Sequence, residues 1–182
     1  MVGKANDVVR KELTIHASQR RAFQAFTEQM DLWWPRIHHI GNSEMKEAVL
    51  ETKQGGRWYE VGVDGTECNW GKVLVWNPPH KLVLAWQITA DWQYDPNFFT
   101  EVEVNFIEKG PKITSVILEH RNIEKYGIKA QEIWSAFDSE GGWTGMLKTF
   151  AAIAETEATA EGPYCGVGVI RVAGAEEVNA VR

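Results

Sequence analysis

The sequence has few cysteines, no long hydrophobic run and no excess of positive charge. Its two cysteines, Cys68 and Cys165, lie far apart and form no CxxC pair, which is typical of reduced thiols in a cytosolic protein. No apolar run approaches the length that spans a bilayer, and residues 1–10 carry charge without the apolar core of a secretory signal. We therefore expect a soluble, cytoplasmic protein without a membrane span.

The charge balance is negative. The chain has 19 Lys and Arg against 25 Asp and Glu, a formal net charge of −6 and an isoelectric point near 5.4. Phosphates and anionic head groups do not attract an acidic surface, so we expect no non-specific binding to nucleic acid. At 182 residues, 44% of them hydrophobic, the chain is long enough for one domain with a core and short for two.

Tryptophan is the residue in excess, with nine in the chain. Each indole buries a large rigid surface and has one N–H group that needs a partner. Such a set fits either a bulky core or an aromatic-lined cavity, and the sequence leaves both open. The nine are Trp33, Trp34, Trp58, Trp70, Trp76, Trp86, Trp92, Trp134 and Trp143.

The hydrophobic periodicity predicts an α+β fold. Asp7–His16 reads as a strand, Ser18 as the N-cap of a helix, and apolar residues from Ala22 to Met30 as a helix of about three turns that Pro35 closes. Six strand-like segments follow, separated by turn residues, which indicates an antiparallel meander. They are Lys46–Thr52, Gly56–Val63, Cys68–Trp76, Lys81–Ile88, Phe98–Ile107 and Ile113–His120.

A long helix from about Ser139 to Glu155 is predicted to cover the apolar side of this sheet, because its apolar residues share one stripe. A C-terminal helix across a curved antiparallel sheet is the helix-grip arrangement, with a cavity where sheet and helix do not meet. The predicted order is strand, helix, an optional short second helical turn within residues 36–43, six strands, helix. We predict one helix-grip domain over residues 1–155. Residues 156–182 are predicted to form an extension of unknown role, with a linker over 156–162 that is followed either by a strand over 164–172 and a short helix over 175–181 or by a mobile tail.

Several motifs, in the correct order over residues 8–155, resemble the family related to the activator of Hsp90 ATPase, the Aha1-like branch of the START/Bet v 1-like (SRPBCC) superfamily. The resemblance implies the helix-grip fold. The superfamily includes lipid and hormone carriers, polyketide cyclases, hydroxylase domains and co-chaperone domains, so the fold alone does not determine the function. The motifs are Phe26-Thr27 with Trp33-Trp34-Pro35, Gly55-Gly56-Arg57-Trp58, Trp70 to Leu74, Asn77 to Val83 with Trp86, Thr100 to Val104, Thr114 to His120, and Gly142-Trp143-Thr144.

No motif for nucleophilic, metal-dependent or nucleotide-dependent catalysis is present. His38 and His39 are adjacent and point in different directions, which favours a surface loop pair over a metal site. Gly166-x-Gly168 is too short a signal for phosphate binding. We expect no metal and no cofactor.

His120 is the first of two candidates for chemistry. It is in line with Val116 and Leu118 and would point toward the cavity, where a neutral imidazole could orient a ligand or act as an acid or base. The alternative, which we favour at this point, is a partly solvated histidine at a strand end that is merely bonded to a neighbour.

Glu60 is the second candidate, and its direction is ambiguous. It faces inward if Trp58 does, as the resemblance implies, and outward if Tyr59, Val61 and Val63 are inward, as apolarity alone suggests. An inward carboxylate would need a partner, either Arg57 or a ligand group, because an unpaired buried charge is costly.

Our leading hypothesis is a non-catalytic domain that binds a small hydrophobic or aromatic molecule between the sheet and the C-terminal helix. One alternative is a cyclase or dehydrase-type enzyme with His120 and Glu60 as proton carriers in the same cavity. Another is a protein-interaction module, with chaperone contact through the acidic surface and the aromatic residues of the loop 92–99. The predicted ligand-binding residues are Trp34, Trp58, Trp70, Trp86, Val102, Val104, Leu118, His120, Trp143, Met146, Leu147 and Phe150.

Overall fold

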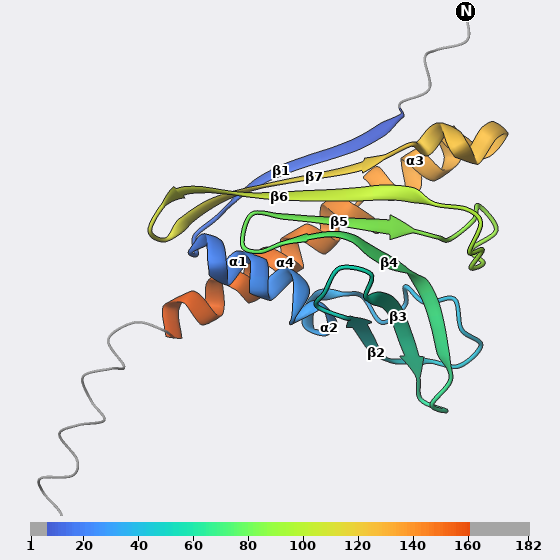
Figure 1. The fold of residues 1–182 in the computed structure, drawn as a ribbon, viewed down its shortest axis with the longest axis horizontal. Coiled ribbons are helices and arrows are strands. Elements are labelled where there is room, and N and C mark those ends of the chain that lie inside the picture. Colours follow the sequence, from blue (N-terminus) through green and yellow to red (C-terminus); the bar gives the residue numbers. More distant parts are fainter. Residues whose placement is uncertain (1–6, 161–182) are drawn as a thin grey trace, which may run out of the picture.

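A computed structural model describes residues 7–160 of the chain. Seven strands form one antiparallel sheet in the order β1-β7-β6-β5-β4-β3-β2 (Figure 1). The strands are β1 Val8–Ile15, β2 Met45–Leu50, β3 Arg57–Gly62, β4 Glu67–Asn77, β5 Lys81–Trp86, β6 Thr100–Gly110 and β7 Ile113–Arg121. The helices are α1 Gln19–Thr27, α2 Met30–Trp33, the 3-10 helix η1 Ile123–Lys129, α3 Ala130–Asp138 and α4 Trp143–Ala160.

The sheet curls around α4, and this confirms the predicted helix-grip fold (Figure 1). Short connections join β2 to β3, β3 to β4, β4 to β5 and β6 to β7, as expected for a meander. The pairing register shifts between Trp58 and Tyr59 on β3 and again between Val73 and Val75 on β4. Irregularities of this kind bend strands and increase their twist.

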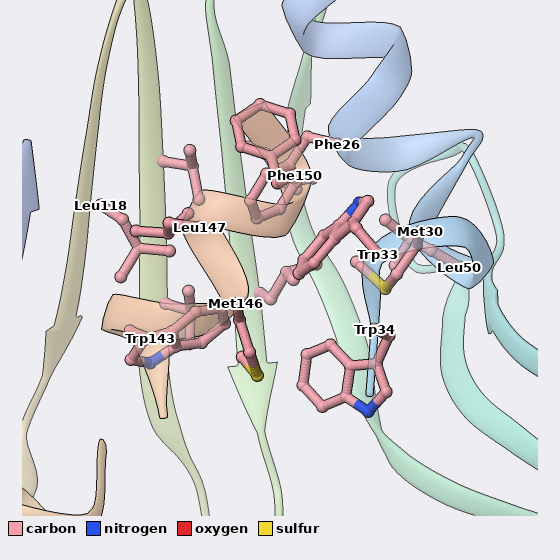
Figure 2. Close-up of a cluster of buried hydrophobic side chains, with 14 of the residues drawn as sticks. Phe26, Met30, Trp33, Trp34, Leu50, Leu118, Trp143, Met146, Leu147 and Phe150 are labelled. Atoms are coloured by element: carbon pink, nitrogen blue, oxygen red, sulfur yellow. The ribbon is translucent and has the colours of Figure 1, made fainter. Parts of the chain in front are cut away.

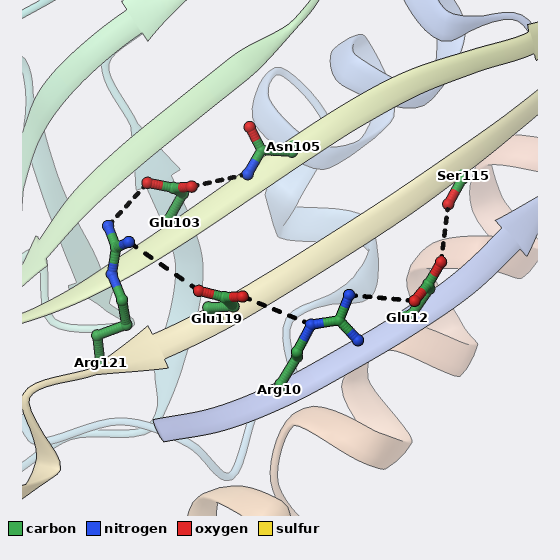
Figure 3. Close-up of polar contacts among 7 residues, drawn as sticks. All are labelled: Arg10, Glu12, Glu103, Asn105, Ser115, Glu119 and Arg121. Atoms are coloured by element: carbon green, nitrogen blue, oxygen red, sulfur yellow. Dashed lines mark hydrogen bonds and ion pairs between the residues drawn. The ribbon is translucent and has the colours of Figure 1, made fainter. Parts of the chain in front are cut away.

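The alternation of side chains along β6 shows the two faces of the sheet. Val102 and Val104 are fully buried against the helices. The intervening Glu103 lies on the outer face, where Arg121 donates to its Oε2 atom at 2.7 Å. Figure 3 follows this outer chain of charges across three strands to Arg10 and Glu12. Val102 and Val104 therefore face the concave side of the sheet, which the helices cover.

The core lies between that concave side and the helices α1, α2 and α4. Phe150 of α4 packs edge-on against Phe26, with ring centroids 5.2 Å apart, and against Trp33 at 5.9 Å (Figure 2). Leu147 lies on the same side of α4 toward Leu118 of β7 (Figure 2). These side chains fill the middle of the grip.

The N-terminal helix begins as predicted but ends early. Ser18 is the N-cap, since its Oγ atom accepts the backbone N–H of Arg21 at 3.1 Å. The predicted single helix up to Pro35 is wrong, because the chain breaks after Thr27 and resumes as α2. The break turns Trp33 into the core and leaves Trp34 beyond the helix end.

The C-terminal helix begins four residues later than predicted. Ser139 to Gly142 form a turn, in which the Gly142 N–H donates to the Ser139 carbonyl at 2.9 Å. A Cβ atom on Gly142 would lie 2.4 Å from the carbonyl oxygens of Ala136 and Phe137, so this tight turn requires glycine. Helix α3, which precedes the turn, was missed by the sequence analysis.

The predicted C-terminal extension overlaps with α4. The helix continues to Ala160, so the linker predicted over residues 156–162 is wrong for its first five residues, and the domain boundary predicted after residue 155 falls inside a helix. The strand predicted over 164–172 and the helix predicted over 175–181 lie outside the described residues.

Candidate functional site

A cavity of about 420 Å³ opens between the N-terminal end of α4, the C-terminal end of α3 and the loop 35–44. Its lining includes no Lys, Arg, Asp or Glu, and most of the wall is aromatic or aliphatic. The lining residues are Trp34, Ile37, His38, His39, Ile40, Trp70, Trp86, Trp92, His120, Ala136, Phe137, Ser139, Gly141, Gly142, Trp143 and Met146.

Five indoles surround this cavity, and Trp34 is central among them. Its ring centroid lies 4.8 Å from that of Trp70, 6.3 Å from that of Trp86 and 6.2 Å from that of Trp143. Trp92 adds a fifth, half-exposed ring at the rim, edge-on to Phe137. A flat guest would therefore meet indole surfaces on several sides.

The other four indoles lie elsewhere. Trp33 and Trp58 are fully buried in the core. Trp76 packs edge-on against Phe23, and Trp134 donates its Nε1–H to the Val8 carbonyl. The two interpretations of the tryptophan excess, a bulky core and a lined cavity, thus each describe part of the set.

His120 is completely buried, so the expected partly solvated strand-end position is wrong. Its Nδ1 atom accepts the Nε1–H of Trp143 at 3.1 Å. An indole nitrogen can only donate, so Nδ1 is unprotonated and Nε2 carries the hydrogen. Nε2 then donates to the Thr100 Oγ1 atom at 2.7 Å, and the ring stacks on Phe137 with centroids 4.3 Å apart.

Both ring nitrogens of His120 are therefore occupied. Burial lowers the pKa of His120 to about 3, because a charged imidazole loses its hydration there. Protonation would also place an N–H group against the N–H of Trp143. His120 serves as a neutral connection between β7 and α4 at the cavity wall.

This burial makes the protein sensitive to mild acid. The unfolded chain protonates His120 near pH 6.5, whereas the folded chain does so near pH 3. Between these values the unfolded state binds more protons, so the free energy of unfolding should fall by roughly 1 kcal/mol for each pH unit of acidification. Urea unfolding of the wild type and of His120→Gln between about pH 7 and pH 5 measures this slope, which should be shallower in the variant by the contribution of His120. Equal slopes would contradict the assignment.

Glu60 faces inward and is almost fully buried, whereas Val63 is 61% exposed. The alternative with Tyr59, Val61 and Val63 inward is therefore wrong. The Oε2 atom of Glu60 accepts the Nε1–H of Trp70 at 2.6 Å and the backbone N–H of Ile40 at 2.9 Å. Its Oε1 atom accepts the Gly41 N–H at 2.6 Å.

The Glu60 carboxylate is thus paired neither with Arg57 nor with a ligand group. Arg57 points to the outer face, where it contacts Glu67 and Asn69. Three donors already use the Glu60 carboxylate. It anchors the loop 35–44, which forms one wall of the cavity.

Further hydrogen bonds fix this loop. The Nε1–H of Trp34 donates to the His38 carbonyl at 3.0 Å, and His39 Nδ1 lies 3.1 Å from the Gly41 carbonyl. A Cβ atom on Gly41 would come within 2.6 Å of Glu60 Oε1, so the close approach of the loop to the carboxylate requires glycine. These contacts within the chain hold the loop as one wall of the cavity.

The structure brings half of the twelve predicted ligand-binding residues to the cavity. These are Trp34, Trp70, Trp86, His120, Trp143 and Met146. The other six are buried in the core and do not line it: Trp58, Val102, Val104, Leu118, Leu147 and Phe150.

The sequence analysis missed the loop and α3 as parts of the wall. The spacing of Ile133 and Phe137, both buried, is a helical signal that could have identified α3. The loop residues Ile37, His38 and Ile40 carry no periodic signal. His38 and His39 lie on a loop as expected, but both border the cavity.

Neither a metal site nor a membrane-spanning helix is found within residues 7–160. No group of three or more His, Cys, Asp or Glu side chains within this range could hold a metal ion. Within the same part of the chain, no helix has the length and apolar character to cross a bilayer.

The family model for activator of Hsp90 ATPase homologue 1-like proteins matches residues 16–155. The chain belongs to this family. This confirms the resemblance found in the motifs, and the match covers most of the helix-grip domain together with most of the cavity wall.

Solved structures with this fold include members of different activities. An anthrahydroquino-γ-pyrone synthase, Txn09, solved in complex with SUM, is 36% identical; the match covers 80% of this chain and 96% of that one, with a TM-score of 0.58. CalC, a self-sacrificing resistance protein from Micromonospora echinospora, is 28% identical; the match covers 85% and 98%, with a TM-score of 0.65.

A more distant structure shares the fold alone. The Aha1 dimer from Colwellia psychrerythraea is 15% identical, with coverage of 81% and 96% and a TM-score of 0.55. Comparison with curated protein sequences gave no match.

Proposed function

We propose that this protein binds an uncharged, flat aromatic molecule in the cavity at the N-terminal end of α4. The observation that carries the proposal is the convergence of five indoles around one opening of about 420 Å³ with no Lys, Arg, Asp or Glu in its lining. This volume is within the range of small-molecule pockets.

Such a wall favours aromatic guests for two physical reasons. Apolar burial contributes about 25 cal/mol per Å², so a guest that buries ~200 Å² gains roughly 5 kcal/mol before the entropic costs of association. Stacked or edge-on contacts with the rings of Trp34 and Trp143 add to this. A charged guest would find no side chain of opposite charge.

The relatives support the same chemical class. The synthase that is 36% identical is named for a product with fused rings. The resistance protein CalC, which is 28% identical, shows that the fold also occurs in proteins that are not named as enzymes. An enzyme that converts a molecule must also bind it. Binding is therefore the function proposed here.

Replacement of Trp143 by alanine tests the proposal. We expect the affinity for a three-ring probe, 2-hydroxyanthraquinone, to fall about tenfold, because one ring of the wall and its stacking contact are lost. Isothermal titration calorimetry measures the affinity. The matched control is Trp134→Ala, which removes an indole outside the cavity. Equal affinities of the two variants, or no binding to the wild type, would contradict the proposal.

A second candidate function is chemical conversion of the bound molecule, which the identity to a synthase favours. The two proton carriers expected from the sequence, His120 and Glu60, are both engaged in fixed hydrogen bonds. The remaining imidazoles at the cavity that could supply an acid or base for turnover are those of His38 and His39. Product analysis after incubation with candidate precursors distinguishes conversion from binding.

The chaperone alternative has less support. Trp92, the first residue of the aromatic loop 92–99, packs on Phe137 at the rim of the cavity. At 15% identity, the Aha1 dimer is evidence for the fold and not for a partner. Contact with a chaperone remains a prediction from the sequence.

A further inference from the structure

We propose that His38 selects, among aromatic guests, those with a free hydroxyl group on the ring system. This inference rests on the proposed function, since it assigns the polar part of the same ligand. It follows from which polar groups of the cavity wall are still able to form a hydrogen bond.

Three of the five indole N–H groups of the wall are already bonded, whereas the Nε1–H of Trp86 is buried without a hydrogen-bond partner among the described residues and stays available as a donor. Trp34 donates to the His38 carbonyl, Trp70 donates to Glu60, and Trp143 donates to His120. These three indoles therefore offer a guest their ring faces and no donor. They determine the shape of the ligand, but they cannot recognise its polar substituents.

The other polar side chains of the wall mostly retain acceptors. The hydroxyl of Ser139 donates to the Ala136 carbonyl at 2.7 Å, so its oxygen retains lone pairs only. His39 Nδ1 faces the Gly41 carbonyl, which can only accept, so Nδ1 carries the hydrogen and neutral His39 presents Nε2 as an acceptor. A guest that satisfies these atoms must donate.

His38 differs from both, because neither nitrogen of its ring has a hydrogen-bond partner within residues 7–160. The ring is half-buried at the cavity wall and edge-on to Trp34, with centroids 6.4 Å apart. Burial lowers the pKa of His38, so the neutral form, with one donor and one acceptor, dominates at neutral pH.

A hydroxyl group fits this set of atoms better than an ether. Both can accept from an imidazole N–H, but only the hydroxyl can donate to the vacant acceptors of His38, His39 or Ser139. The aromatic guest is therefore assigned to the hydroxylated class. His38 is the residue best placed to discriminate, because both of its ring nitrogens are free.

Two matched probes test this assignment by calorimetry at a pH that keeps the phenol protonated: 2-hydroxyanthraquinone and 2-methoxyanthraquinone. Wild-type protein should bind the hydroxyl probe about three- to tenfold more tightly, as expected for one net hydrogen bond. His38→Phe retains an aromatic ring but cannot form the hydrogen bond, so it should bind both probes with similar affinity. His38→Gln keeps a donor and an acceptor and should recover part of the preference.

The control is His80→Phe, since His80 does not line this cavity and its replacement should leave the preference unchanged. Equal binding of both probes to the wild type, or an unchanged preference in His38→Phe, would overturn the role of His38 while leaving the proposed function intact. If neither probe binds the wild type, both proposals fail for this class of molecule.

Discussion

Replacement of Glu60 by glutamine should lower the free energy of unfolding by about 3 kcal/mol and weaken aromatic-ligand binding at the same time. The carboxylate accepts three N–H groups, from Ile40, Gly41 and Trp70. Glutamine has the same shape, but its NH2 group must face at least one of these donors. That donor stays buried without an acceptor, and the loop 35–44 loses its anchor.

Urea unfolding and calorimetry with 2-hydroxyanthraquinone measure the two effects. The matched control is Glu67→Gln on the neighbouring strand β4, where the carboxylate is half-exposed and pairs with Arg57. Surface pairs of this kind contribute little, so the control should change stability by at most ~1 kcal/mol and leave binding unchanged. A Glu60→Gln variant as stable as the control would show that the loop does not depend on the carboxylate.

Adjacent tryptophans should respond differently to truncation. Trp33→Ala should cost about 3–5 kcal/mol of stability, because it leaves a closed void between α1, α2 and α4. Trp34→Ala should cost less, about 2 kcal/mol, because the space it vacates joins an existing opening and the penalty for a closed cavity does not apply. Both side chains are nearly inaccessible, with 1% and 5% exposure, so burial alone does not predict the difference.

Denaturation of the two variants compares their stabilities, and titration with the aromatic probe compares their affinities. Trp34→Ala should lose affinity, since it removes the central ring of the wall. Trp33→Ala should retain affinity under conditions where it is folded. The reverse order of stabilities, or equal affinities, would show that the cavity is not formed as described.

Local patterns were enough to predict most of the fold. The alternation of Val102 and Val104 with charged residues predicted the inward face of β6 correctly, because one face of that strand is apolar and the other is polar. The N-cap at Ser18 was also readable, because a single side chain determines it. Helix α3 was not predicted, since the 3-10 turn before it, which bends at Gly127, interrupts the helical pattern.

The direction of Glu60 could not be decided locally. Both parities of β3 place apolar side chains on one face, and the deciding contacts come from Ile40 and Gly41, about twenty positions earlier in the chain. A backbone N–H group carries no sequence signature. The partner of a buried carboxylate is therefore hidden from pattern analysis when it is main chain.

The four predicted ligand-binding residues on α4 divide according to their position along the helix axis. Trp143 and Met146 lie at its N-terminal end, beside the opening, whereas Leu147 and Phe150 lie further along toward Leu118 and Phe26 (Figure 2). Periodicity identifies which side of a helix is inward. It does not show which part of that side meets the sheet and which part meets a hollow.

The anchored loop also has a thermodynamic consequence for any guest. A wall whose main chain is already held by Glu60 has little conformational freedom left to lose on complex formation. Association with a preorganised apolar cavity is commonly driven by enthalpy at room temperature and accompanied by a negative heat-capacity change. The Glu60 carboxylate, which does not line the cavity, thereby reduces the conformational entropy that the wall would lose on binding.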